Sequence, residues 1–81
     1  MEILKFSATW CGPCKMLTKT LEGLTLPHSV KDIDVDLDPD LAQKHHVRGV
    51  PTLVLIDDKG NEVRRSVGML SETQLKEWAG E

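Results

Sequence analysis

The sequence is poor in aromatic residues, in cysteine and in long apolar segments. Of its 81 residues, 4% are aromatic, none is tyrosine, and two are cysteine. Two cysteines are too few for a scaffold held together by disulfides. The longest apolar run, Leu53 to Ile56, is far shorter than the ~20 residues that a membrane-spanning helix needs. A disulfide-stapled fold and a membrane-spanning helix are therefore both excluded.

An excess of positive charge is absent as well. Lys and Arg number 10 against 13 Asp and Glu, so the formal net charge is −3. Binding to a nucleic-acid backbone is driven by surplus Lys and Arg, so no nucleic-acid partner is expected. Residues 1–5 show no basic segment followed by an apolar one, which predicts no export signal and a cytoplasmic location.

Length and composition predict one small globular domain. The chain is 40% hydrophobic and 28% charged, a balance that distinguishes it from disordered sequences. Its 81 residues lie at the lower end of single-domain sizes. We therefore expect one domain over residues 1–81, a single small core and a monomer.

The first half of the chain predicts two strands joined by a helix. Residues 2–7 form a short apolar segment typical of a strand. The apolar residues that follow recur at the three-and-four spacing of one helical face, at Cys14, Leu17, Leu21 and Leu24. Residues 31–38 then alternate between apolar and aspartate side chains. This alternation predicts a half-buried strand whose acidic face guards a sheet edge.

The second half begins with a short helix and two strands. Asp38 and Pro39 are typical of a helix cap and of the first helical position, and this helix should run to about His46. Residues 52–56 are apolar without alternation, which indicates a strand covered on both faces. A turn separates them from residues 62–67, so the two segments predict an antiparallel hairpin.

A capping box at Ser71 and Gln74 begins the last helix. Leu70 and Leu75 can form a hydrophobic staple across it, and Trp78 shares a face with Leu75, which places Trp78 in the core. The predicted order is β-α-β-α-β-β-α. Two strands joined through a helix should be parallel with a right-handed crossover. We therefore predict an α/β fold with a four-stranded mixed sheet flanked by three helices.

The segment Trp10-Cys11-Gly12-Pro13-Cys14 lies where the first strand passes into the first helix. Cys11 stands at the helix cap, where free N–H groups and the helix dipole favour an anion and therefore the thiolate. Pro13 lacks an N–H that the first turn would leave unused. Cys14 falls within that turn, close enough to form a disulfide with Cys11. We predict an exposed, nucleophilic Cys11 and a shielded Cys14 that resolves the mixed disulfide.

A C-x-x-C pair also occurs in zinc sites, and His45 and His46 are the candidate nitrogen ligands. Neighbouring helical residues point about 100° apart and do not easily converge on one metal. The gap from Cys14 to these histidines is about 30 residues, against about 12–15 in zinc fingers. We therefore expect no metal. A C-x-x-C that follows a strand and opens a helix favours redox chemistry.

Taken together, these residues resemble the thioredoxin family. The resemblance covers nearly the whole chain and rests on WCGPCK at 10–15, Asp36, Pro39, RGVPT at 48–52, GNEV at 60–63, VG at 67–68 and the LSETQLKEW helix. It implies the thioredoxin fold and a cis peptide bond before Pro51. It also implies a docking surface around Cys11, with Val50 pairing to an extended substrate, made of Trp10, Gly12, Pro13, Val50, Gly68 and Met69.

The same resemblance implies a thiol-disulfide oxidoreductase that reduces protein disulfides through a Cys-Gly-Pro-Cys dithiol/disulfide cycle. No bound cofactor is expected beyond the redox-active Cys11–Cys14 disulfide. Electrons should come from a flavin- and NADPH-dependent thioredoxin reductase and pass to oxidised proteins such as a ribonucleotide reductase. Two alternatives stay open. One is a glutaredoxin-like protein reduced by glutathione, although its Cys-Pro-Tyr-Cys motif is absent; the other is a non-catalytic binding module that uses the same surface.

The sequence departs from the family pattern at several positions. We expect a short form without the family's opening strand and helix. Ser7 replaces a tryptophan, and Lys19 replaces a proline that kinks the first helix. Lys5 and Asp32 stand where the family has a buried acid and the lysine facing it. We predict a reversed ion pair beneath the cysteines, which favours their thiolates and lets Asp32 exchange a proton with Cys14; the alternative is a Lys5 amine that reaches water.

Overall fold

Seven helices and strands make up residues 1–80, the part of the chain that the computed structural model describes; Glu81, the last residue of the expected domain, lies outside it. In chain order they are β1 (Glu2–Ser7), α1 (Gly12–Glu22), β2 (Ser29–Asp34), α2 (Pro39–Lys44), β3 (Thr52–Ile56), β4 (Glu62–Val67) and α3 (Glu72–Gly80). The predicted order of elements is confirmed. Within these residues, no helix is long and apolar enough to cross a membrane.

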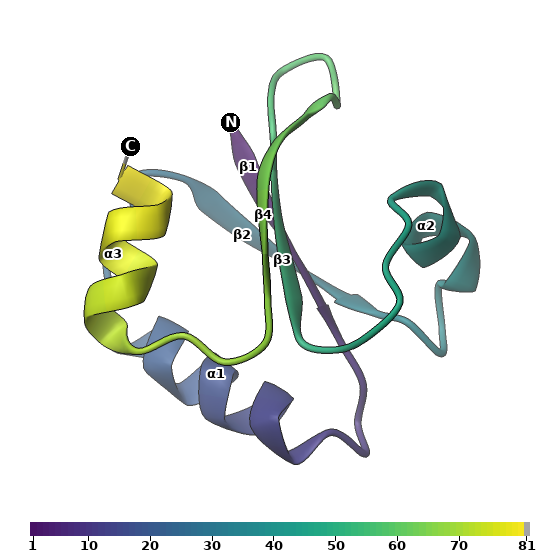
Figure 1. The fold of residues 1–81 in the computed structure, drawn as a ribbon, viewed down its shortest axis with the longest axis horizontal. Helices are drawn as coiled ribbons and strands as arrows, with labels where there is room; N and C mark the ends of the chain where they lie inside the picture. Colours follow the sequence, from purple (N-terminus) through teal and green to yellow (C-terminus); the bar gives the residue numbers. More distant parts are fainter. Residues whose placement is uncertain (81) are drawn as a thin grey trace.

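The four strands form one mixed sheet in the order β2-β1-β3-β4 (Figure 1). β1 pairs in parallel with β2 and antiparallel with β3, and β3 pairs antiparallel with β4. β1 is therefore central, and the segment that leaves it after Ser7 starts from the middle of the sheet. β2, with its aspartates, lies on an edge as predicted.

Helices cover both faces of this sheet, so the core has two parts (Figure 1). Along β1 and β3, successive side chains point to opposite faces. On the face covered by α1 and α3, the buried residues are Ile3, Leu17, Leu53, Leu55, Leu75 and Ala79. On the face covered by α2, they are Leu4, Phe6, Ile33, Ala42 and Val54. Both faces of β1 are therefore shielded, which keeps its C-terminal end in a fixed place.

β2 differs from its prediction at both ends. It begins at Ser29 and ends at Asp34, so the strand expected over residues 31–38 is wrong in its second half. The Asp34 carboxylate accepts the backbone N–H of Asp36 at 2.8 Å, which turns the chain away from the sheet. Leu37, expected on the buried face, is 85% exposed as a result.

The end of α2 also differs. This helix ends at Lys44 rather than near His46. His46 has a φ of 55°, a left-handed conformation that does not continue a right-handed helix. Asp38 does occupy the N-cap position, but its side chain makes no capping hydrogen bond.

The capping box of α3 is confirmed. The Ser71 hydroxyl accepts the N–H of Gln74 at 3.2 Å, and the Gln74 side-chain oxygen accepts the N–H of Ser71 at 2.9 Å. Leu75 is fully buried, and Leu70 and Trp78 pack against the same cluster. This fixes the loop between β4 and α3, which packs through Leu70 against the cluster that contains Leu17 of α1.

Candidate active site

Cys11 and Cys14 lie at the N-terminus of α1, directly beyond the central strand. Cys11 is the N-cap residue, and its sulfur accepts the backbone N–H of Cys14 at 3.1 Å. The two sulfurs are joined in a disulfide, with Cα atoms 5.3 Å apart. The first turn of α1 contains no acidic residue. Its free N–H groups and helix dipole therefore act unopposed there and favour a thiolate when the disulfide is opened.

The expected contrast in exposure between the two cysteines is wrong for the disulfide form. Cys11 is 4% exposed and Cys14 is 2% exposed, so both are buried. They form a small cluster with Ala8, against which Val35 and Val50 pack. Cys11 is covered because residues from three segments meet over it, an arrangement that no local spacing reveals.

An open, mainly apolar hollow lies beside this pair. Its volume is about 150 Å³, and it is lined by Trp10, Val35, Val47, Arg48, Gly49 and Val50. Trp10 is 70% exposed, and its indole N–H donates to the Asp36 carboxylate at 2.9 Å. The ring is therefore held at the surface instead of folding into the core. The hollow is large enough for one apolar side chain of a docked partner.

The other expected docking residues lie nearby with different exposures. The Val50–Pro51 peptide bond is cis, and Pro51 is fully buried. The Gly68 N–H donates to the Pro51 carbonyl at 2.9 Å, and Gly68 has a φ of 93°, a conformation that favours glycine. Met69 is 39% exposed. Met69, with Gly12 and Pro13, is not among the described residues that line the hollow.

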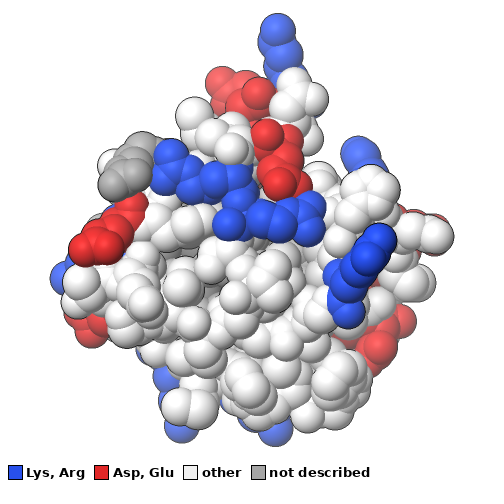
Figure 2. Space-filling model, in the orientation of Figure 1, with Lys and Arg blue, Asp and Glu red and all other residues white. Residues whose placement is uncertain are grey.

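Figure 2 shows the surface of the same region. Charged side chains cross the upper part of this face, whereas the lower part, over the loop after β4 and the start of α1, is largely uncharged. Four exposed apolar side chains lie in or directly beside these two segments of the chain: Trp10, Met16, Val67 and Met69. A surface of this kind suits contact with another protein.

Lys5 and Asp32 form the predicted reversed ion pair. They are partners in the β1–β2 register, and Lys5 Nζ lies 2.6 Å from an oxygen of Asp32. Only the lysine is buried, with 5% of its side chain exposed against 72% for Asp32. Lys5 Nζ also donates to the Thr18 hydroxyl on α1. The lysine therefore does not snorkel to water, and the group between it and Cys14 is Thr18 instead of Asp32.

His45 and His46 are the candidate metal ligands that the sequence offered. No three His, Cys, Asp or Glu side chains within residues 1–80 are placed to hold a metal ion. The His45 ring packs against Phe6, with centroids 5.8 Å apart. Burial, aided by the charge of Lys44, lowers the pKa of His45.

Arg65 on β4 ties down the loop that carries these histidines. Its guanidinium donates to the carbonyl oxygens of His45 and His46 and forms an ion pair with Glu62 at 2.6 Å. The hydrogen bond that Glu62 accepts from Arg65 lowers the pKa of the Glu62 carboxyl group. The loop leads directly to the residues that line the apolar hollow, so Arg65 helps to position that wall.

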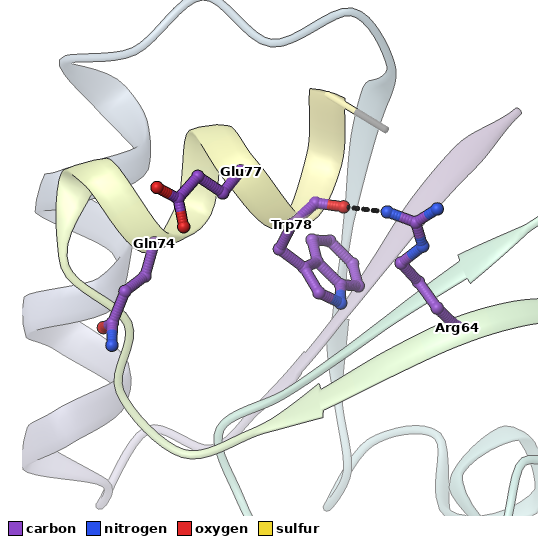
Figure 3. A pocket seen from close by; sticks show the side chains of 4 residues that line it. All are labelled: Arg64, Gln74, Glu77 and Trp78. Carbon is purple, nitrogen blue, oxygen red and sulfur yellow. Dashed lines mark hydrogen bonds between the residues drawn. The ribbon is translucent and has the colours of Figure 1, made fainter.

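A second hollow, of about 410 Å³, lies between β4 and α3 (Figure 3). It is lined by Arg64, Gln74, Glu77 and Trp78. Arg64 donates to the Trp78 carbonyl, and the buried indole N–H of Trp78 has no hydrogen-bond partner among the described residues. None of the lining residues belongs to the cysteine segment. This hollow is larger than the one beside Trp10, but none of the residues that line it is redox-active.

Sequence reasoning missed three contacts of this site. The bonds from Trp10 to Asp36, from Lys5 to Thr18 and from Arg65 to the histidine loop each join different elements. Asp36 was visible only as part of the acidic alternation. No signal in the sequence pointed to Thr18 or Arg65. Their partners depend on how α1 packs on the sheet and on how the loop after α2 lies against β4.

Comparison with known proteins relates the whole chain to one family. The model of the family described as Thioredoxin matches residues 1–81. A thioredoxin of Chlamydia trachomatis is 46% identical over 78 residues, which are 93% of this chain and 76% of the relative. A thioredoxin of Staphylococcus aureus is 38% identical over 81 residues, 95% of this chain and 77% of the relative.

Solved structures give the same relationship. A mutant thioredoxin from Halobacterium salinarum superposes with a TM-score of 0.88 at 44% identity, covering 96% of this chain and 70% of that one. A thioredoxin from Fasciola hepatica has a TM-score of 0.87 at 36% identity, covering 98% of this chain and 77% of that one. The fold and the sequence therefore agree on the relationship.

Proposed function

The chain belongs to the thioredoxin family and is a disulfide oxidoreductase, and we propose that it works as a general reductase of protein disulfides. The observation that carries this proposal is the Cys11–Cys14 disulfide at a helix N-terminus, beside an open apolar hollow. A substrate can reach a dithiol in this place through the hollow, and the helix dipole favours the thiolate form of the cysteine.

The reaction proceeds by two exchanges between thiolate and disulfide. In the reduced protein, the Cys11 thiolate attacks one sulfur of a substrate disulfide, and the other substrate sulfur leaves as a thiolate. Cys14 then attacks Cys11, the bond from Cys11 to the substrate breaks, and the second substrate sulfur leaves. The substrate gains two electrons, and the protein ends with the Cys11–Cys14 disulfide. No further cofactor is needed for this electron balance.

The substrates in this proposal are exposed, extended segments of oxidised proteins. Such a segment would lie over Cys11, with one apolar side chain in the hollow between Trp10 and Val50. Gly12, Pro13, Pro51, Gly68 and Met69 would complete the contact surface. Its largely uncharged character supports a protein partner over a nucleic acid.

Family membership implies that a thioredoxin reductase regenerates the dithiol. We propose the flavin- and NADPH-dependent form as the electron donor, a ribonucleotide reductase as one target, and action as a monomer in the cytoplasm. The net charge of −3 gives no reason to expect a polyanionic partner.

Reduction of insulin tests this proposal. The protein is assayed first with dithiothreitol, then with NADPH and thioredoxin reductase, and then with glutathione as the electron donor. Rapid turnover with the reductase and little with glutathione is the expected result. The reverse preference would indicate a glutaredoxin-like protein. Absence of turnover with every donor, together with partner binding that survives loss of both cysteines, would indicate a binding module.

A further inference from the structure

Three hydrogen-bonded contacts connect the exposed edge of the sheet to the second cysteine. Asp32 pairs with Lys5 Nζ at 2.6 Å, Lys5 Nζ donates to the Thr18 hydroxyl at 2.5 Å, and Thr18 donates to the Cys14 carbonyl at 3.0 Å. The line crosses from β2 through β1 to α1. It ends on the backbone of Cys14, in the helical turn that also carries that residue's sulfur.

The chemistry of lysine determines which group donates and which accepts in these hydrogen bonds. An ammonium group has three donors and no acceptor, so the Thr18 oxygen accepts from Lys5. The proton of the Thr18 hydroxyl is then directed to the Cys14 carbonyl. A threonine that bonds back to the carbonyl four residues earlier is common in helices. Its bond to a buried cation is what distinguishes Thr18.

Thr20 provides the comparison within the same helix. Its hydroxyl donates to the Met16 carbonyl at 3.1 Å, the same contact one step further along α1. Within residues 1–80, no hydrogen bond joins Thr20 to Lys5. If a substitution at Thr18 changes the reaction and the same substitution at Thr20 does not, the difference comes from the contacts of Thr18 with Lys5 and Cys14.

Burial makes the charge of Lys5 effective toward the cysteines. The Lys5 side chain is 5% exposed, whereas that of Asp32 is 72% exposed and is screened by water. Lys5, Thr18 and Asp32 line a hollow of about 200 Å³, and Glu22 on α1 is the third charged residue that lines it. A positive charge two hydrogen bonds from Cys14 acts through a medium of lower dielectric than water.

We propose that Thr18 is a positioning residue for the resolving cysteine, held in its role by Lys5. This proposal rests on the disulfide reductase function above. In the resolving step, Cys14 loses its proton to water and its thiolate attacks Cys11 of the mixed disulfide. The Cys11–Cys14 bond forms, and the substrate sulfur leaves as a thiolate that takes a proton from water. Thr18 anchors the turn that carries Cys14, and its contact with Lys5 keeps positive charge two hydrogen bonds from the Cys14 backbone.

Reaction of the reduced protein with the aromatic disulfide dithiobis-nitrobenzoate separates the two steps. Attack by Cys11 releases one coloured thiolate at a rate proportional to reagent concentration. Resolution by Cys14 releases a second one at a rate independent of reagent concentration. Both phases are followed by absorbance in stopped flow. If the wild-type protein shows no two-phase release, the proposed reductase function itself fails.

The test of Thr18 compares three variants. Thr18→Val should slow the second phase about fivefold to tenfold, the size expected for losing a hydrogen bond to a charged network. The first phase should change by less than about twofold, because Cys11 does not bond to Thr18. Thr18→Ser keeps the hydroxyl and should restore the second phase. Thr20→Val should leave both phases unchanged.

The link to Lys5 has its own test. Lys5→Met should also slow the second phase, and the variant with both Lys5→Met and Thr18→Val should be no slower than the slower single variant, since the two residues act through one path. The pH midpoint of the second phase should rise in both single variants and stay constant in Thr20→Val. A normal second phase in Thr18→Val, or a slow one in Thr18→Ser, would overturn the proposal while leaving the reductase function intact.

Discussion

At the scale of single residues, the two cysteines differ in how they are held rather than in how much of them is exposed. The Cys11 sulfur accepts a backbone N–H and packs near Val50 at the edge of the apolar hollow. Cys14 lies on the face of α1 that packs onto the sheet, and its carbonyl is bonded to Thr18. Trp10, the chain neighbour of Cys11, lines the hollow, so we expect a partner that docks there to meet Cys11 first.

Replacing each cysteine separately tests this assignment. Cys11→Ser should abolish disulfide reduction, because the attacking thiolate is lost. Cys14→Ser should accumulate mixed disulfides with substrates, because the resolving thiol is lost. Mass spectrometry of the protein after incubation with an oxidised substrate detects these adducts. If adducts accumulated on Cys11→Ser instead, the two roles would have to be exchanged.

The Lys5–Asp32 pair should respond unequally to loss of either partner. Asp32→Asn leaves a buried ammonium with Thr18 as its remaining partner and should lower the free energy of unfolding by about 1–3 kcal/mol. Lys5→Met leaves a carboxylate that is already 72% exposed and can be solvated, so its cost should be smaller. Urea unfolding of the two variants and the wild type measures the difference. A larger loss in Lys5→Met would contradict the burial argument.

At the scale of elements, local patterns predicted the type of each helix and strand better than its ends. The alternation over residues 31–38 predicted β2 and its edge position, but the Asp34 side chain turns the chain before Leu37 is reached. The helix predicted to run to about His46 likewise ends at Lys44, because His46 adopts a left-handed conformation that does not continue it. Both ends are set by side-chain and backbone contacts that hydrophobic periodicity does not report.

Arg65 shows how one strand residue fixes a neighbouring loop, and its partner Glu62 makes the contact sensitive to acid. The lowered pKa of Glu62 means that the folded state favours its ionised form. Stability from the pair is therefore complete above the pKa of Glu62 in the unfolded chain, about 4.3, and is lost as the pH falls through the lower folded value.

Glu62→Gln tests this pH dependence. Between about pH 5.5 and pH 3, the wild type should lose more stability than the variant, by about 0.5 kcal/mol for a pair this exposed. Urea midpoints at the two pH values measure the loss. His45, whose pKa is lowered by burial, is present in both proteins, so its own titration largely cancels in the comparison. High salt should reduce the difference. Identical losses in both proteins would show that the pair contributes nothing.

At the scale of the whole molecule, the order of elements, the parallel β1–β2 pair and the β3–β4 hairpin followed from the sequence because each segment carried a distinct pattern. The antiparallel pairing of β1 with β3 was not predicted. The unbroken apolar run of residues 52–56 predicted a strand with both faces covered, and β3 has helices on both sides. The exchange of Lys5 and Asp32 predicted a contact between strands, which the register confirms. The position of Trp10 against Asp36 and the contacts of Thr18 could not be predicted, because they depend on how whole elements pack.

The stability of the molecule should depend on these two cores rather than on its disulfide. The Cys11–Cys14 bond closes a loop of four residues, for which chain entropy gives at most about 2 kcal/mol. The total for a chain of 81 residues is roughly 4–12 kcal/mol. Reduction with dithiothreitol should therefore lower the urea midpoint modestly and leave a cooperative transition. The variant with both Cys11→Ser and Cys14→Ser should unfold at a similar midpoint with and without reductant. Unfolding of the wild type by reductant alone would show that the disulfide is a structural staple, and would remove the argument that this pair serves chemistry.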